Sequence, residues 1–162
     1  MATQTLGTLL RTLSEHVDSA VEQFYSRAGL TYKARFTPIF RVLLANGPST
    51  IRQISIAAGI SHSAASQTLS QMVKSGLVQS TIGHDARQRI ISLTPAAFEI
   101  VPQLERQWRA TDIAVQSLNS DLGMSLPNLL ATAIQILEER HFVDRIEDAF
   151  RSDSQQGTKL SE

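Results

Sequence analysis

The stretch that decides the fold covers residues 50–94 and reads TIRQISIAAGISHSAASQTLSQMVKSGLVQSTIGHDARQRIISLT. Thr50 followed three residues later by Gln53 is the pattern of a capping box, which predicts that a helix begins at this point. Gly59 is placed to end this short helix in the left-handed backbone conformation that glycine adopts most easily. Ser61 is a favourable N-cap for a second helix. This order of residues predicts a helix-turn-helix.

The second helix of this motif divides into two faces. Its apolar positions, which are expected to face the core, are Ala65, Leu69, Met72 and Val73. Its outer positions are polar, namely Ser63, Ser66, Gln67, Ser70 and Lys74. Short hydrogen-bonding side chains without carboxylates suit a helix that enters the major groove of DNA beside phosphates. The alternative is an ordinary serine-rich face that is only solvated.

A hairpin is predicted after this helix. Residues 77–82 and 90–94 are β-prone, and between them Gly83 begins a turn that carries Arg87 and Arg89. A basic hairpin suits a wing that lies along a DNA backbone or inserts an arginine into a narrow minor groove. The alternative is an exposed hairpin whose charges only prevent edge-to-edge pairing.

These residues resemble the MarR family of bacterial transcription regulators. The resemblance rests on Gly76-Leu77-Val78, Asp85-Ala86-Arg87 and Leu93-Thr94, and it extends from the N-terminal helix to about Phe150. It implies a mainly α-helical fold with a small β-hairpin wing, that is, a winged helix-turn-helix with long N- and C-terminal dimerisation helices. It also implies a homodimer that binds a pseudo-palindromic operator in double-stranded DNA, most often as a repressor.

The resemblance also assigns roles to individual residues. The helix from Ser61 would lie in the major groove, Arg87 would enter the minor groove, and Asp85 would orient Arg87. Many relatives carry an arginine in the middle of the major-groove helix, where this chain has serine and glutamine. The residues expected at the DNA interface are Arg52, Ser61, His62, Ser63, Ser66, Gln67, Ser70, Lys74, Asp85, Arg87 and Arg89.

The distribution of charge agrees with this expectation although the whole chain is neutral, with 15 basic and 15 acidic residues. Residues 33–89 hold seven Lys or Arg against Asp85 alone, whereas residues 90–162 hold six against eleven acids. Basic residues therefore concentrate in the segment that contains the helix-turn-helix and the hairpin. Such a concentration is the electrostatic pattern expected of a surface that contacts phosphates.

The two ends of the chain are expected to form dimerisation helices. The predicted parts are an N-terminal helix in 1–32, a DNA-binding lobe in 33–94, C-terminal helices in 95–150 and a disordered tail in 151–162, within one structural domain overall. Apolar stripes mark the first and third parts, for example Leu6, Leu10 and Val17, and Leu130, Ile134 and Leu137. These stripes either pack on one another within a monomer or pack between subunits. The second arrangement is favoured because one helix-turn-helix reads only a half-site.

Enzymatic chemistry has little support in the sequence. There is no cysteine, which excludes disulfides, thiol sensors and thiolate metal sites. The four histidines lack metal-ligand spacing, no nucleophile motif or phosphate-binding loop is present, and no cofactor is expected. A small hydrolase is therefore disfavoured, and the main alternative to a DNA-binding regulator is a winged helix that binds another protein. No signal peptide or membrane span is recognised, so a cytoplasmic protein is expected.

A small aromatic effector is a further partner that the resemblance implies. Regulators of this family often bind such molecules between the dimerisation helices and the DNA-binding lobe. The residues expected to line a cleft of this kind are His16, Tyr32, Phe36, Phe40 and Trp108. The alternative is that the aromatic residues are core, as large apolar side chains at helical spacing usually are.

Overall fold

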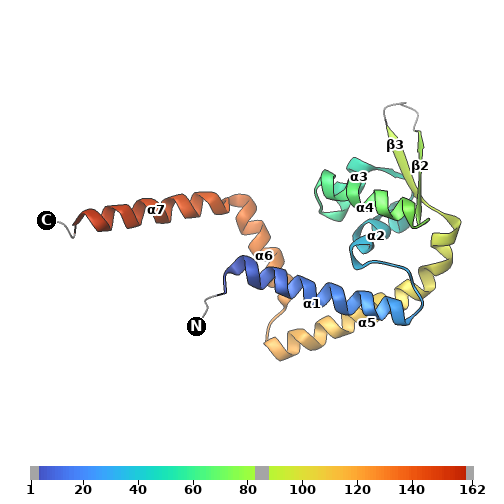
Figure 1. Ribbon diagram of the computed structural model, residues 1–162, viewed down its shortest axis with the longest axis horizontal. Coiled ribbons are helices and arrows are strands. Elements are labelled where there is room, and N and C mark those ends of the chain that lie inside the picture. The colour runs from blue at the N-terminus through green and yellow to red at the C-terminus, as the bar shows by residue number, and fades with distance from the viewer. Residues whose placement is uncertain (1–3, 83–87, 160–162) are drawn as a thin grey trace. The chain divides into compact units, whose positions relative to one another are not determined.

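A computed structural model describes residues 4–82 and 88–159 of the chain (Figure 1). The helices are α1 (Leu6–Arg27), η1 (Ala34–Phe36, a 3-10 turn), α2 (Thr37–Asn46), α3 (Ile51–Ala58), α4 (His62–Lys74), α5 (Pro95–Leu122), α6 (Leu126–Glu139) and α7 (Phe142–Lys159). The strands are β1 (Ser49–Thr50), β2 (Val78–Ile82) and β3 (Arg89–Leu93). The mainly helical fold with a small β-hairpin that was expected from the sequence is confirmed.

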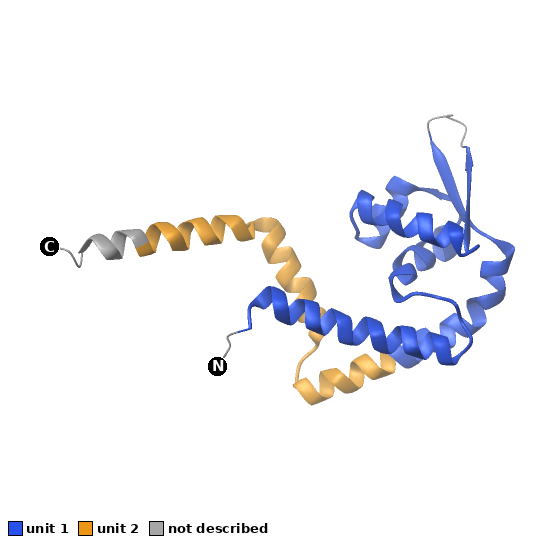
Figure 2. Cartoon of the chain, in the orientation of Figure 1, with its two compact units in different colours: residues 1–111 blue, residues 112–162 orange. Residues whose placement is uncertain are grey.

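The chain divides into two compact units, which Figure 2 shows in different colours. The first unit covers residues 1–111 and contains α1, the helix-turn-helix, the sheet and the first part of α5. The second unit covers residues 112–162 and contains the end of α5 together with α6 and α7. Within the described residues, no helix is long and apolar enough to cross a membrane.

The helix-turn-helix forms as its sequence predicts. The Thr50 side chain accepts a hydrogen bond from the Gln53 amide at 3.2 Å, and the Thr50 amide donates to Gln53 Oε1 at 2.8 Å, which completes the capping box. Gly59 ends α3 with φ of 65° and ψ of 32°, in the left-handed region. Ser61 then caps α4 by accepting a hydrogen bond from the Ala64 amide at 3.1 Å. Local chemistry alone therefore fixes where both helices of the motif begin.

The sheet has three antiparallel strands in the order β1–β3–β2. The hairpin register pairs Val78 with Leu93 and Ile82 with Arg89. The short strand β1 was not predicted from the sequence; it pairs Thr50 with Ile90 and leads directly into α3. The returning strand of the hairpin is therefore joined to the first residue of the helix-turn-helix.

The core of the first unit lies between these elements. Its most deeply buried side chains include Ile39 and Phe40 from α2, Ile54 from α3, Met72 from α4 and Leu104 from α5. They hold the helix-turn-helix, the sheet and the start of α5 against α2 as one packed body. The helix α2 begins at Thr37, and Pro38 occupies its first turn, where proline is tolerated.

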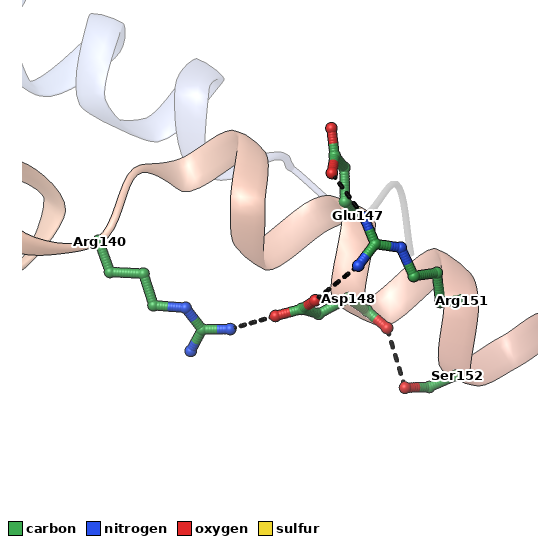
Figure 3. Close-up of polar contacts among 5 residues, drawn as sticks. All are labelled: Arg140, Glu147, Asp148, Arg151 and Ser152. Carbon is green, nitrogen blue, oxygen red and sulfur yellow. Dashed lines mark hydrogen bonds and ion pairs between the residues drawn. The ribbon is translucent and has the colours of Figure 1, made fainter.

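The second unit contains a break between its last two helices. The segment from residue 125 to 150 forms two helices, because Arg140 adopts an extended backbone with φ of −141° and ends α6. Across this break the Arg140 guanidinium lies 2.5 Å from the Asp148 carboxylate, and Arg151 contacts Glu147 and Asp148 (Figure 3). The helix α7 continues to Lys159, well into the segment expected to be a disordered tail.

Candidate nucleic-acid interface

The outer face of α4 is polar and open to solvent. Ser63, Gln67, Ser70 and Lys74 are exposed and Ser66 is half-buried, whereas Ala65, Leu69 and Met72 are buried. The exposed positions follow one another at intervals of four, three and four residues, so they lie along one side of the helix. Val73, which was expected to face the core, is instead 46% exposed at the edge of this side. Hydroxyl, amide and ammonium groups are thus presented together on a convex helix.

A network around the turn after α4 fixes the hairpin to this helix. Gly76 adopts a φ of 69°, and the Leu77 amide donates to the Met72 carbonyl at 3.0 Å. The Thr94 hydroxyl donates to the Gly76 carbonyl at 2.6 Å and also accepts a bond from the Ala97 amide. One threonine therefore connects the end of α4, the end of β3 and the start of α5, which holds the hairpin in a defined position beside α4.

Three basic side chains gather where the hairpin, α3 and α4 meet. Arg52 lies in the first turn of α3, His62 is the first residue of α4, and Arg89 begins β3. They border a hollow of about 330 Å³, here named the wing-base hollow. Its lining residues are Thr50, Ile51, Arg52, His62, Gln88 and Arg89. The sequence predicted each of the three basic residues as a DNA contact, and the structure brings them to one place.

Carboxylates are missing from the long segment that supplies α4 and most of the wing-base hollow. Between Glu22 and Asp85 the sequence contains no aspartate or glutamate, whereas Lys33, Arg35, Arg41, Arg52 and Lys74 lie in this interval. The acid-free segment includes α2, α3, α4 and β2. A surface built from it presents an uncompensated positive potential toward an approaching polyanion.

The tip of the hairpin lies outside the described residues. The predicted minor-groove arginine Arg87 and its expected orienting partner Asp85 belong to this tip. The strands on both sides of it are described, and Ile82 with Arg89 is the last pair of residues between β2 and β3 before the tip. The roles of Arg87 and Asp85 remain predictions from the sequence.

The aromatic residues expected to line an effector cleft form a buried cluster. Tyr32 meets Phe36 and Phe40 edge-on at ring-centroid distances of 5.7 Å, and Phe40 meets Trp108 at 6.1 Å. Tyr25, which the sequence did not single out, packs against Tyr32 at 5.1 Å. These rings are core residues, whereas His16 is exposed on α1.

Polar atoms nevertheless remain unpaired in this aromatic cluster. The hydroxyl of Tyr32 and the indole N–H of Trp108 are buried and find no hydrogen-bond partner within the described chain. Burial raises the pKa of the Tyr32 hydroxyl, so it remains a proton donor at neutral pH. The guanidinium of Arg41 lies over the Trp108 ring, 4.6 Å from its centroid. Two unpaired donors and a cation thus accompany an apolar cluster.

Comparison with known proteins defines the fold. The family model of the sugar-specific transcriptional regulator TrmB matches residues 37–102, which include the helix-turn-helix and the sheet. No curated protein is similar enough to this chain to count as a match. The regulator MOSR of M. tuberculosis, solved in complex with DNA, is 18% identical with a TM-score of 0.68; the alignment covers 86% of this chain and 100% of that one.

Two further solved structures are similar along nearly their whole length. A MarR family regulator from Silicibacter pomeroyi is 21% identical with a TM-score of 0.60, and 85% of this chain and 98% of that one are covered. The PcaV regulator of Streptomyces coelicolor, solved with its natural ligand, is 15% identical with a TM-score of 0.59. That alignment covers 86% of this chain and 99% of the PcaV chain.

The protein is thus a winged helix-turn-helix protein. More particularly, it has the fold of the MarR family regulators, as the resemblance in the sequence implied. The solved structures named above are described as transcriptional regulators, and none of them is described as an enzyme.

Proposed function

We propose that the protein is a sequence-specific DNA-binding transcription regulator. The observation that carries this proposal is the exposed, acid-free face of α4 next to the three basic side chains of the wing-base hollow. In this arrangement α4 lies in a major groove, where Gln67 has the geometry to recognise adenine through paired hydrogen bonds. Arg52, Lys74 and Arg89 neutralise phosphates on either side.

A carboxylate on this face provides the sharpest test. Gln67→Glu places a negative charge of nearly the same shape at the centre of the proposed interface, where it would oppose the phosphates. We expect duplex DNA binding to weaken by about tenfold or more, measured by fluorescence anisotropy with a labelled duplex. The matched control is Gln116→Glu, which makes the same change of charge at an exposed position of α5. Equal losses in both variants would contradict an interface on α4.

We further propose that the regulator acts as a homodimer. Apolar side chains on α6 and α7 are open to solvent within the second unit, among them Ile134 at 59% and Ile146 at 55% exposure. In the first unit α1 also exposes leucines, including Leu6 and Leu10. Exposed apolar stripes of this length indicate a protein interface. A second copy is the favoured partner, because two half-sites of a pseudo-palindromic operator require two reading helices related by twofold symmetry.

Repression that is relieved by a small aromatic acid is the form of regulation that we propose. The unpaired donors on Tyr32 and Trp108, with Arg41 beside them, offer hydrogen bonds and positive charge to a carboxylate, and the surrounding rings suit an aromatic body. Because the cluster is buried in the described structure, such a ligand must select a conformation in which the rings separate. Repression is relieved only if that conformation binds DNA less tightly.

The single tryptophan of the chain reports directly on this proposal. Adding benzoate is expected to change the emission of Trp108 in a saturable manner and to weaken duplex binding over the same concentration range. The uncharged analogue benzyl alcohol is the control and is expected to have neither effect. A benzoate titration that leaves both the emission and the DNA affinity unchanged would argue against an aromatic acid as the effector class.

A further inference from the structure

The wing-base hollow is formed by residues from three separate elements. Because β1 pairs with β3 and leads directly into α3, Thr50 lies opposite Ile90, and this register places the first turn of α3 next to the start of β3. The short turn after α3 then returns the chain so that α4 begins at the same hollow. Arg52, His62 and Arg89 are therefore held together by the fold.

In the part of the chain that the structure describes, the three basic side chains are not engaged elsewhere. Within the described residues, none of them forms a side-chain hydrogen bond or an ion pair, and all three are exposed. The charged groups that face His62 across the hollow are Arg52 from α3 and Arg89 from β3. The remaining lining residues, Thr50, Ile51 and Gln88, are uncharged, and the next charged group on α4 is Lys74 at its far end.

We propose that the wing-base hollow holds one backbone phosphate of the duplex and that His62 makes this contact dependent on pH. This inference rests on the proposed DNA-binding function. Two arginines supply permanent positive charge and bidentate hydrogen bonds to phosphate oxygens. The first turns of α3 and α4 also border the hollow, so that backbone partial charges favour an anion as well. His62 adds a third charge only when its imidazole is protonated.

The direction of the pH effect follows from this arrangement. Histidine side chains change charge between about pH 5 and 8. Without a phosphate, a protonated His62 would face two arginines and no acid among the lining residues, so that three positive charges would repel one another. A phosphate in the hollow compensates that repulsion, so binding of DNA is accompanied by uptake of a proton. Because protonation of His62 and binding of the duplex favour each other, duplex affinity increases as the pH falls.

The test compares duplex affinity at about pH 6 and about pH 8 at fixed ionic strength. The probe is a labelled duplex of about 20 base pairs, which spans two helical turns. For the natural chain we expect binding to be about three- to tenfold tighter at the lower pH. The binding constant should also depend more steeply on salt concentration at the lower pH, by about one released counterion per chain. His62→Gln is expected to lose most of the pH dependence, because the amide side chain carries no charge at either pH.

Three control variants isolate the hollow. Lys74→Gln removes a positive charge from α4 outside the hollow and is expected to weaken binding equally at both pH values. His141→Gln and His84→Gln, which change the other histidines outside α1, are expected to retain the pH dependence. Duplex binding that is independent of pH, or a pH dependence that survives His62→Gln, would overturn this inference and leave the proposed function intact. A chain that binds no duplex at either pH would overturn both.

Discussion

Replacement of both Ile134 and Leu137 with glutamate is expected to convert the protein from a dimer into monomers. Operator binding is expected to weaken by about a hundredfold or more. The two side chains lie three residues apart on α6 and are 59% and 38% exposed, so they share one apolar side of the helix. Burying two carboxylates in an apolar interface is strongly unfavourable. Loss of the dimer separates the two reading helices and removes the effective concentration that links their binding.

A substitution on the other side of the same helix controls for helix stability and charge. Thr132→Glu is exposed and lies two residues from Ile134, which places it on nearly the opposite side of α6. This variant is expected to remain dimeric in sedimentation equilibrium and to keep its operator affinity. If the double variant also remained dimeric with unchanged affinity, the apolar side of α6 would not be part of the subunit interface.

Arg87→Ala is expected to weaken operator binding by about 1–3 kcal/mol, or roughly five- to 150-fold. The reason is that an arginine at a wing tip enters the minor groove, where the negative potential is strongest over narrow A·T-rich segments. The loss should therefore be largest for operators with A·T-rich flanks and small for duplexes with G·C-rich flanks. Electrophoretic shift assays with both kinds of duplex measure the difference.

Arg109→Ala is the matched control for Arg87. It removes the same charge at an exposed position of α5 and is expected to change affinity for both duplexes only slightly. Equal affinity of Arg87→Ala and the natural chain on the A·T-rich duplex would show that the wing does not read the minor groove. Such a result would leave the contacts of α4 unaffected.

The elements that the sequence predicted correctly are those with strong local signals. The helix caps at Thr50, Gly59 and Ser61 depend on hydrogen bonds between residues at most five positions apart. Their effect is therefore encoded in a short stretch of sequence. The polar face of α4 was also predictable, since a helix of known start and period assigns each residue to a side. The exposure of Val73 was not predicted, because it lies at the boundary between the two sides.

Features that depend on distant parts of the chain were missed. The strand β1 has only two residues and exists because Ser49 and Thr50 pair with Ile91 and Ile90, some forty residues later. The wing-base hollow depends on the same pairing, so its three basic residues were predicted individually but their meeting was not. The break between α6 and α7 occurs at Arg140 without any glycine or proline, and the local sequence carried no signal for it.

The most direct measurement is a titration of the natural chain with a duplex that contains a palindrome from the DNA upstream of its own gene. Footprinting locates the site, and sedimentation of the complex gives its stoichiometry. We expect two chains per duplex, protection of two half-sites about one helical turn apart, and an affinity that falls steeply with salt. Binding of a single chain, or an affinity that does not change with salt, would contradict a basic reading surface duplicated by twofold symmetry.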